Sequence, residues 1–298
     1  MSKVLAVVGS ANLDLVITVQ HRSAPGETRF GDTFSEHLGG KGLNQALAAS
    51  DIVATHFIGS VGGDDAADRI RSLLRSAGVG AHYLDSSPSA TGRAVVTVTP
   101  DGENAITVIP GANADLGVDF VRRALDEINP TAVLVQQEVP AAVVDAVGEW
   151  CDEQRVRLVL NPSPARPLHP RTLQAADPVV LNQHEAAELC GETGAPEDLL
   201  TRLSARCTSV VITLGRHGAV AADMHDRWHE PGRSVEVRDT TGAGDALVGT
   251  LAAHLASGDD LRTALNAGTQ VAADLIRFAR HERAAGHHDH QPTDKDVP

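Results

Sequence analysis

Residues 239–245, which read Asp-Thr-Thr-Gly-Ala-Gly-Asp, have the composition of a site that binds and transfers phosphate. A helical pattern follows, so Gly242, Ala243 and Gly244 fall at a helix start. Backbone N–H groups there can converge on a phosphate oxygen, and the helix dipole adds positive potential. Asp245 would repel a resting phosphate, but its carboxylate can accept the proton of an attacking hydroxyl. The simpler alternative, a glycine-rich helix start with Asp245 as a first-turn charge, leaves most of the motif unexplained.

Residues 39–46, which read Gly-Gly-Lys-Gly-Leu-Asn-Gln-Ala, contain a second candidate group, Lys41. Only three of the 25 basic residues are lysines, which singles out a lysine flanked by glycines. Its ammonium group can donate to a sugar hydroxyl or a phosphate, and glycines allow close approach of the backbone; a solvated turn lysine is the alternative. Asn12 and Asp14 follow the first predicted strand, where α/β sheets present ligands, and an aspartate can accept hydrogen bonds from two neighbouring hydroxyls.

The elements that must position these residues alternate along the chain. The predicted strands are residues 4–8, 132–135, 156–160, 179–181 and 210–213, and the predicted helices are residues 64–77, 118–128 and 141–153. This alternation predicts an α/β fold with a mostly parallel central sheet and helices on both faces, in a single domain over residues 1–298. Residues 15–38 and 91–109 read as hairpins, which we assign to a small antiparallel β lid. Edge hairpins of the main sheet are the alternative.

The two glycine-rich segments resemble the signatures of the ribokinase family, also called the PfkB carbohydrate kinases. Further segments resemble that family in the same order: Pro110-Gly111-Ala112-Asn113, Asn161-Pro162-Ser163-Pro164-Ala165, Asn182-Gln183-His184-Glu185 and Thr213-Leu214-Gly215. The resemblance implies the fold of that family and transfer of phosphate from ATP to a primary hydroxyl of a sugar, with D-ribose as the expected substrate. A Walker-type loop and a dinucleotide-binding glycine motif are both absent from the sequence.

The resemblance also implies which residues bind the sugar. These are Asn12, Asp14, Gly40, Lys41, Asn44, Glu138 and Asp245, with Asp14 on the ribose diol, Gly40 as a backbone contact and Asp245 as the base. A helix cap for Asn44 and a loop carboxylate for Glu138 are the simpler alternatives. A second hypothesis is a kinase of the same fold that acts on a nucleoside, fructose or another pentose. A third is a relative that binds sugar or nucleotide without turnover.

ATP, Mg²⁺ and a monovalent cation such as K⁺ are the cofactors that the resemblance implies. Asn182 and Glu185 match a segment that organises Mg²⁺ through water, although alone this spacing is usually a capping box. Asp239 and Thr241 match one half of a K⁺ site. The residues implied for the nucleotide are Asn182, Thr213, Gly215, Gly218, Gly242, Gly244 and Thr269, although a plain turn explains Gly215 and Gly218 equally well. Beyond Thr269 the match fails: residues 274–283 predict a charged helix where the family has a proline-bearing loop.

Composition restricts the classes of partner and the cellular location that we expect for the protein. The formal charge of −14, without a basic stripe, argues against nucleic acid as a partner. No run reaches the ~20 apolar residues of a membrane-spanning helix, and residues 1–8 read as a buried strand rather than as a secretory signal. We therefore expect a soluble, cytoplasmic enzyme with small-molecule partners, and by resemblance a homodimer through the lid. The three cysteines lack paired spacing and predict free thiols, and residues 285–298 predict a disordered tail.

Overall fold

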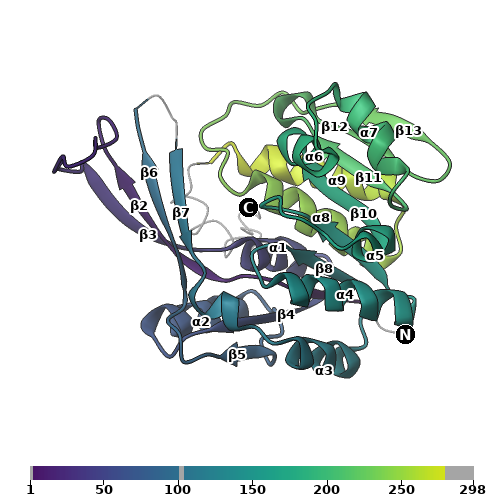
Figure 1. Cartoon of the computed structure of the whole chain (residues 1–298), viewed down its shortest axis with the longest axis horizontal. Coiled ribbons are helices and arrows are strands. Elements are labelled where there is room, and N and C mark those ends of the chain that lie inside the picture. The colour runs from purple at the N-terminus through teal and green to yellow at the C-terminus, as the bar shows by residue number, and fades with distance from the viewer. Residues whose placement is uncertain (1–2, 101–103, 279–298) are drawn as a thin grey trace, which may run out of the picture.

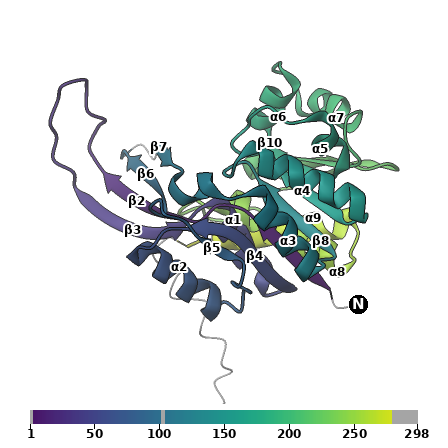
Figure 2. The same cartoon turned by 60° about the horizontal axis from the view of Figure 1, so that its bottom comes forward.

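The computed structural model describes residues 3–100 and 104–278. Its larger sheet has nine strands, in spatial order β13 (Arg227–Glu230), β12 (Ala219–Ala222), β11 (Val210–Thr213), β10 (Ala176–Asn182), β9 (Arg157–Asn161), β8 (Ala132–Gln136), β1 (Val4–Val8), β4 (Ala54–Val61) and β5 (Leu84–Ser86). A second sheet has the order β3 (Thr33–Gly39), β2 (Asn12–Thr18), β6 (Gly92–Val98) and β7 (Asn104–Ile109). Figures 1 and 2 show that this second sheet projects away from the main body.

Helices cover both faces of the larger sheet (Figure 1). They are α1 (Lys41–Ser50), α2 (Asp65–Ser76), α3 (Val118–Ile128), α4 (Ala141–Gln154), α5 (Pro170–Ala175), α6 (Gln183–Cys190), α7 (Pro196–Ser204), α8 (Ala243–Ser257) and α9 (Leu261–Leu275), with 3₁₀ turns η1 (Gly111–Asp115) and η2 (Gly215–His217). In the spatial order given above, all neighbouring strands between β11 and β5 pair in parallel. Strands β12 and β13 extend the sheet beyond β11 by antiparallel pairing. The predicted α/β fold with a mostly parallel sheet is confirmed.

Strand β1 lies between β4 and β8, so the chain leaves it in both directions along the sheet. Such a switch point opens a crevice at the carboxyl ends of the strands, where ligands of open α/β sheets bind. The segments that follow β1, β8, β9, β10 and β11 therefore meet at one edge. This arrangement places the early glycine-rich turn near the later motifs despite their separation along the chain.

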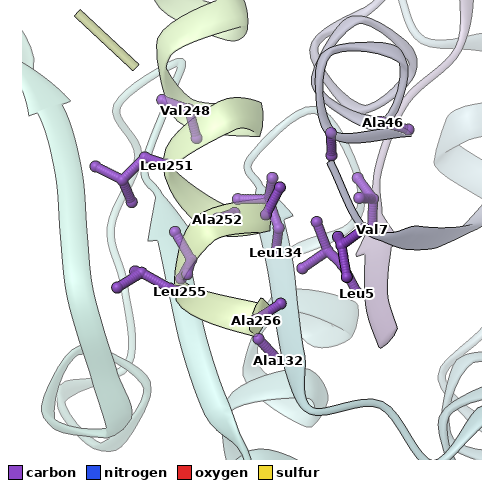
Figure 3. Packing of buried hydrophobic residues seen from close by; sticks show 14 of the residues in the cluster. Leu5, Val7, Ala46, Ala132, Leu134, Val248, Leu251, Ala252, Leu255 and Ala256 are labelled. Carbon is purple, nitrogen blue, oxygen red and sulfur yellow. The ribbon is translucent and has the colours of Figure 1, made fainter. Parts of the chain in front are cut away.

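Apolar residues alternate between the two faces of β1. Leu5 and Val7 are fully buried against the layer that contains α1 and α8, whereas Ala6 and Val8 are fully buried against the layer that contains α3 and α4. Figure 3 shows Ala252 and Ala256 of α8 next to Leu134 and Ala132 of β8, with Leu5 and Val7 of β1 beside them. Burial of each large aliphatic side chain stabilises the fold by about 1.5–3 kcal/mol. This packing fixes α8 on the sheet, and its first turn is thereby held at the strand ends.

The second sheet, which we call the lid, consists of two antiparallel hairpins, as the sequence predicts. Strand β2 pairs with β3 and β6 pairs with β7. The hairpins join through a parallel pairing of β2 with β6 from Asn12↔Gly92 to Thr18↔Val98. Large apolar side chains of the lid are exposed, namely Phe30, Phe34, Ile106, Val108 and Ile109. The lid therefore has an apolar surface that the rest of the chain does not cover.

The C-terminal region differs from the sequence prediction. The predicted charged helix over residues 274–283 is wrong at residues 276–278, because α9 ends at Leu275 and these three residues form a turn and a bend. The N–H groups of Arg238 and Asp239 donate to the carbonyl of Ile276 at 2.8 and 3.3 Å, so the carbonyl faces the late glycine-rich loop. Residues 279–283 and the predicted tail at 285–298 lie outside the described residues.

Two further features bear on the sequence expectations. In the part of the chain that the structure describes, no helix has the length and apolar character needed to span a membrane. Cys151, Cys190 and Cys207 are free thiols. Burial raises the pKa of Cys151, and it raises the pKa of Cys207 to about 12. These two thiols stay protonated near neutral pH, and a protonated thiol is a poor nucleophile.

Candidate active site

The start of α8 presents main-chain N–H groups to open space. Gly242 precedes the helix with a φ of 78°, and no side chain caps this helix end. A Cβ atom built on Gly242 or on Gly244 would meet no heavy atom within 4 Å. The N–H of Ala243 differs from its neighbours because it donates to the carbonyl of Thr240 at 3.2 Å. An anion can approach this helix end directly, and both the first-turn N–H groups and the helix dipole favour it.

The carboxylate of Asp245 accepts one hydrogen bond on each oxygen, and both donors come from α1. Asn44 Nδ2 lies 3.0 Å from Oδ2, and Gln45 Nε2 lies 3.0 Å from Oδ1. Two amide donors, one on each oxygen, fix the plane of the carboxylate. The first turn of α8 therefore carries an oriented, half-buried carboxylate beside an open anion-binding helix end.

Close packing of α1 against α8 makes these contacts possible. Gly249 lies one helical turn beyond Asp245, and a Cβ atom there would overlap the main-chain oxygen of Gln45. The turn before α1 is equally tight, since Gly40 has a φ of 94° and its Cβ atom would lie 2.9 Å from the Ser10 carbonyl oxygen. Gly249 thus lets α8 approach α1, and Gly40 lets the early glycine-rich turn approach the segment that follows β1.

Hydrogen bonds to Glu138 link the early glycine-rich turn to the segment that follows β8. Its Oε2 accepts from Ser10 Oγ at 2.5 Å and from the N–H of Lys41 at 3.1 Å. Lys41 is the first residue of α1, and its half-buried side chain lines the same cavity as Asp245. The structure thus brings Lys41, Asn44, Glu138 and Asp245 into one region, as the sequence predicts for a substrate site.

A cavity of about 160 Å³ connects the late motif with the ends of the middle strands. Asp245, Gly242 and Gly244 line it together with Lys41. Its remaining lining residues come mainly from the ends of β9, β10 and β11 and the segments that follow: Asn161, Ser163, Val180, Leu181, Asn182, Glu185, Thr213 and Val248. The predicted base, the predicted anion-binding turn and three residues predicted to bind nucleotide or metal therefore share one space.

Asn12 and Asp14 lie at the base of the lid and do not line this cavity. Asn12 is buried, and its Oδ1 accepts a hydrogen bond from Asn113 Nδ2 at 2.8 Å. With this oxygen occupied, the Asn12 side chain can bind a ligand by donating through its Nδ2 group. A Cβ atom on Gly39 would overlap Asp14 Oδ2, so the Asp14 carboxylate lies over the early glycine-rich turn. The two residues therefore border the early glycine-rich turn at the base of the lid.

The pair Asn182 and Glu185 forms a capping box at the start of α6. Asn182 Oδ1 accepts from the N–H of Glu185 at 2.9 Å, and Glu185 Oε2 accepts from the N–H of Asn182 at 2.8 Å. The interpretation of this spacing as a capping box is therefore confirmed. Both residues nevertheless line the cavity, and the second carboxylate oxygen of Glu185 is not used by the capping box.

Three residues predicted to bind nucleotide lie outside the cavity. Gly215 and Gly218 have positive φ in the turn between β11 and β12, and a Cβ atom on Gly218 would overlap the carbonyl of Glu230. Chain geometry alone therefore explains Gly218. Thr269 is buried on α9, and its hydroxyl is among the buried polar atoms of the described residues that have no hydrogen-bond partner. Asp239, predicted for K⁺, accepts from the N–H of Thr241 at 2.8 Å.

Sequence reasoning gave no site role to four polar residues that support the site, although three of them fall within segments that resemble the family. Ser10 and Asn113 hold the turn after β1, while Gln45 and Asn161 lie next to Asp245. Gln45 occupies a fully buried position of α1 among small and apolar residues. A polar residue on the apolar face of a predicted helix was the signal that could have identified it.

Comparisons with known proteins agree with this geometry. A family model described as pfkB family carbohydrate kinase matches residues 2–277. The chain is 35% identical over 271 residues to the ribokinase of Bacillus subtilis (strain 168), with 90% of this chain and 91% of that protein covered. It is 34% identical over 287 residues to the ribokinase of Staphylococcus aureus (strain COL), with 93% and 94% covered.

Similarity extends to solved structures. The structure of Arabidopsis thaliana ribokinase complexed with ribose and ATP matches this fold with a TM-score of 0.82 at 27% sequence identity. The match covers 93% of this chain and 94% of that one.

Proposed function

The chain belongs to the pfkB family of carbohydrate kinases, and we propose that it transfers the γ-phosphoryl group of ATP to the C5 hydroxyl of D-ribose. The family and its relatives make it a phosphotransferase with an alcohol group as acceptor. Ribokinase relatives at 34–35% identity support ribose as the sugar. One observation carries the proposal: the Asp245 carboxylate, the uncapped start of α8 and Lys41 line one cavity.

In the proposed reaction, Asp245 removes the proton from the C5 hydroxyl while that oxygen attacks the γ-phosphorus. The O5–P bond forms, the bond from the γ-phosphorus to the β,γ-bridging oxygen breaks, and ADP leaves with the electron pair. Gly242, Ala243 and Gly244 start the helix whose N–H groups stabilise the charge on the transferred group. Asn12, Asp14, Gly40, Lys41, Asn44 and Glu138 bind and orient the sugar, and closure of the lid excludes water.

For the nucleotide and its metal we propose Asn182, Thr213, Gly215, Gly218 and Thr269, with Asn182 and Glu185 holding Mg²⁺ through water. The residues fit this ion, because amide and carboxylate oxygens are the donors that it prefers. The described residues contain no cluster of three or more His, Cys, Asp or Glu side chains that could hold a metal ion by themselves. Mg²⁺, when bound with ATP, neutralises charge on the phosphates.

A monovalent cation site is part of the proposal. Asp239 and the carbonyl of Thr241 would form one half of it next to the start of α8, where K⁺ would add positive potential. The Asp239 carboxylate already turns toward the Thr241 N–H, so this loop is ordered around it. Turnover in K⁺ should exceed turnover in tetramethylammonium at equal ionic strength. Equal rates in the two salts would remove the cation from the proposal.

We propose that the chain acts as a single domain whose lid also mediates a homodimer. The support is the exposed apolar side chains of Ile106 and Val108, which lie two residues apart on one face of edge strand β7, since exposed apolar side chains favour association. Sedimentation equilibrium should give twice the chain mass, and Ile106→Ser with Val108→Ser should shift the protein to monomer. A wild-type monomer at micromolar concentration would refute it. Because the phosphoryl donor is ATP, we place the reaction in the cytoplasm, which cell fractionation tests.

A sugar panel tests the substrate. Purified protein with ATP and Mg²⁺ should release ADP in a ribose-dependent manner, and mass spectrometry should detect a pentose monophosphate that is not formed from 5-deoxyribose. 2-Deoxyribose should give a kcat/KM value at least ~10-fold lower, because groups left unpaired by a missing hydroxyl cost about 1–3 kcal/mol. Fructose, other pentoses and nucleosides should also give lower values, because their hydroxyls or added groups are placed differently from those of ribose. A higher kcat/KM for a nucleoside or fructose would reassign the substrate, and ligand binding without product would exclude turnover.

Glu185→Gln tests the role of this residue at the metal. Glutamine keeps the side-chain oxygen that accepts from the Asn182 N–H, so the capping box and the Tm should be preserved. Loss of the charge should raise the Mg²⁺ concentration for half-maximal activity by about 10-fold, the lower end of the effect of residues that support a metal indirectly. An unchanged Mg²⁺ requirement with unchanged Tm would assign Glu185 to helix capping alone.

A further inference from the structure

A chain of buried amide side chains leads from the centre of the sheet to Asp245. Gln136 Nε2 donates to Gln45 Oε1 at 2.6 Å. Gln45 Nε2 in turn donates to Asn161 Oδ1 at 2.9 Å and to Asp245 Oδ1 at 3.0 Å. Gln45 and Gln136 are fully buried, and Asn161 is 6% exposed. The two strand-end residues come from β8 and β9, so this amide chain joins two strands of the sheet to α1 and α8.

The direction of this amide chain is fixed by the main chain. Asn161 Nδ2 donates to the carbonyl of Val180 at 2.8 Å. A backbone carbonyl only accepts hydrogen bonds, so Asn161 must turn its amide nitrogen to Val180 and its oxygen to Gln45. Gln45 must then turn its nitrogen to Asn161, and the same nitrogen faces Asp245. A rotated Gln45 amide would place an oxygen against two acceptors, which is unfavourable in a buried site.

The other end of the amide chain follows the same direction. With its nitrogen committed, Gln45 presents Oε1 to Gln136, which donates to it at 2.6 Å. Gln136 makes this bond although its own Oε1 is a buried oxygen without a partner among the described residues. An unpaired buried acceptor costs free energy, so the orientation of Gln136 is set by Gln45 rather than by its other surroundings.

From this geometry we infer that Gln45 is a positioning residue for phosphoryl transfer, oriented by Asn161 and Gln136. The inference rests on the proposed role of Asp245 as the base. The Gln45 N–H holds Asp245 Oδ1, while Asn44 holds Oδ2 from the same helix. With one oxygen fixed from the buried side, the carboxylate keeps the plane in which it can accept the proton of the sugar hydroxyl. Catalytic groups need such fixed orientation, since small displacements lower the rate strongly.

Gln45→Met tests this inference. Methionine has nearly the length and volume of glutamine but lacks the donor, so packing is kept while the bond to Asp245 is lost. We expect kcat to fall about 10- to 100-fold, the loss expected for one hydrogen bond to a charged group. KM for ribose and for ATP should stay within about threefold, because Gln45 is buried and does not line the cavity.

Gln137→Met is the matched control. Gln137 is 2% exposed and neighbours Gln136, but its side chain bonds to the main chain of Arg166 at 3.3 Å instead of to the amide chain. A buried amide is lost in both variants, so both should lower the Tm. Only Gln45→Met should lower kcat selectively. Equal kcat in the two variants would overturn the inference and assign Gln45 a structural role.

A double-mutant cycle adds a second measurement. Gln136→Met removes one of the bonds that hold the Gln45 amide but leaves the bond to Asn161, so it should lower kcat less than Gln45→Met does. Once Gln45 is methionine, Gln136→Met should have no further effect on kcat, because residue 136 then has no route to Asp245. Independent, multiplicative effects would refute the amide chain. If Gln45→Met did not fold, Gln136→Met against Gln137→Met would decide the inference by the same comparison of kcat.

The same series separates this inference from the proposed function. A wild-type enzyme that is inactive with every sugar, or an Asp245→Asn variant with full activity, would refute the proposed function or its base. An active wild type with an inactive Asp245→Asn and a fully active Gln45→Met would refute the positioning role alone.

Discussion

Asp245→Asn is expected to lower kcat by about 10²- to 10⁴-fold, the range that a positioned general base contributes. The amide keeps the size of the carboxylate but cannot accept the proton of the sugar hydroxyl. One end of the amide also carries an NH₂ group, which would face the donor of Asn44 or of Gln45, each now 3.0 Å from a carboxylate oxygen. Steady-state kinetics with ribose and ATP, combined with calorimetric titration of both ligands, separate lost turnover from lost binding.

Asp260→Asn provides the matched control for this substitution. Asp260 stands at the start of α9, where its side chain accepts from the N–H of Thr263 at 2.7 Å. Asparagine caps helices about as well as aspartate, so neither kcat nor Tm should change appreciably. If Asp245→Asn turned over ribose at a rate close to that of the wild type, another group would have to remove the proton.

Asp245 and Lys41 could be proposed from the sequence because both lie in glycine-rich segments. Gly242 and Gly244 mark the open helix start before Asp245, and Gly40 marks the tight turn before Lys41. Glycines at such positions reflect a backbone requirement, which a single sequence can display. The meeting of these two segments could be expected from the parallel sheet, whose strand ends share one edge.

The residues that orient this chemistry could not be found in the same way. Gln45 lies directly beside Asn44, yet its importance depends on Asn161 and Val180, which are more than a hundred positions away. Local spacing holds no information about such a contact. A glycine can also have two explanations that a sequence does not separate: Gly218 resembles a phosphate-loop residue, and the close approach of the Glu230 carbonyl also requires a glycine there.

The fold shows the same division between local and distant determinants. Helix α3 has the predicted bounds, since its apolar spacing is complete within its own residues. Strand β10 begins at Ala176, before the predicted strand at residues 179–181. The apolar run is interrupted between Ala176 and Val179, where the pairing with β9 shifts register, so the sequence pattern showed only the later part of the strand. The parallel pairing of β2 with β6 joins segments separated by most of the first hundred residues, so hairpin signals could not reveal it.

Gly244→Ala is expected to stabilise the protein and impair its activity. Alanine is favoured over glycine within a helix by up to about 1 kcal/mol, and the new methyl group would meet no heavy atom within 4 Å. Thermal unfolding should show a Tm increase of ~2 °C. The open space above this turn is where a phosphate oxygen must reach the helix N–H groups, so kcat/KM for ATP should fall by about 10²-fold, similar to the loss of one oxyanion-binding donor.

Gly249→Ala is the matched substitution, because it makes the same change five residues further along α8. Its methyl group would overlap the main-chain oxygen of Gln45 and lie 2.9 Å from Ala48 Cβ. Such overpacking costs about 1–3 kcal/mol, so this variant should lose stability despite its better helix propensity. Opposite signs of the Tm change would show that the space above Gly244 is kept open for a ligand and not for packing. A Gly244→Ala enzyme with full activity would exclude this helix end as the phosphate site.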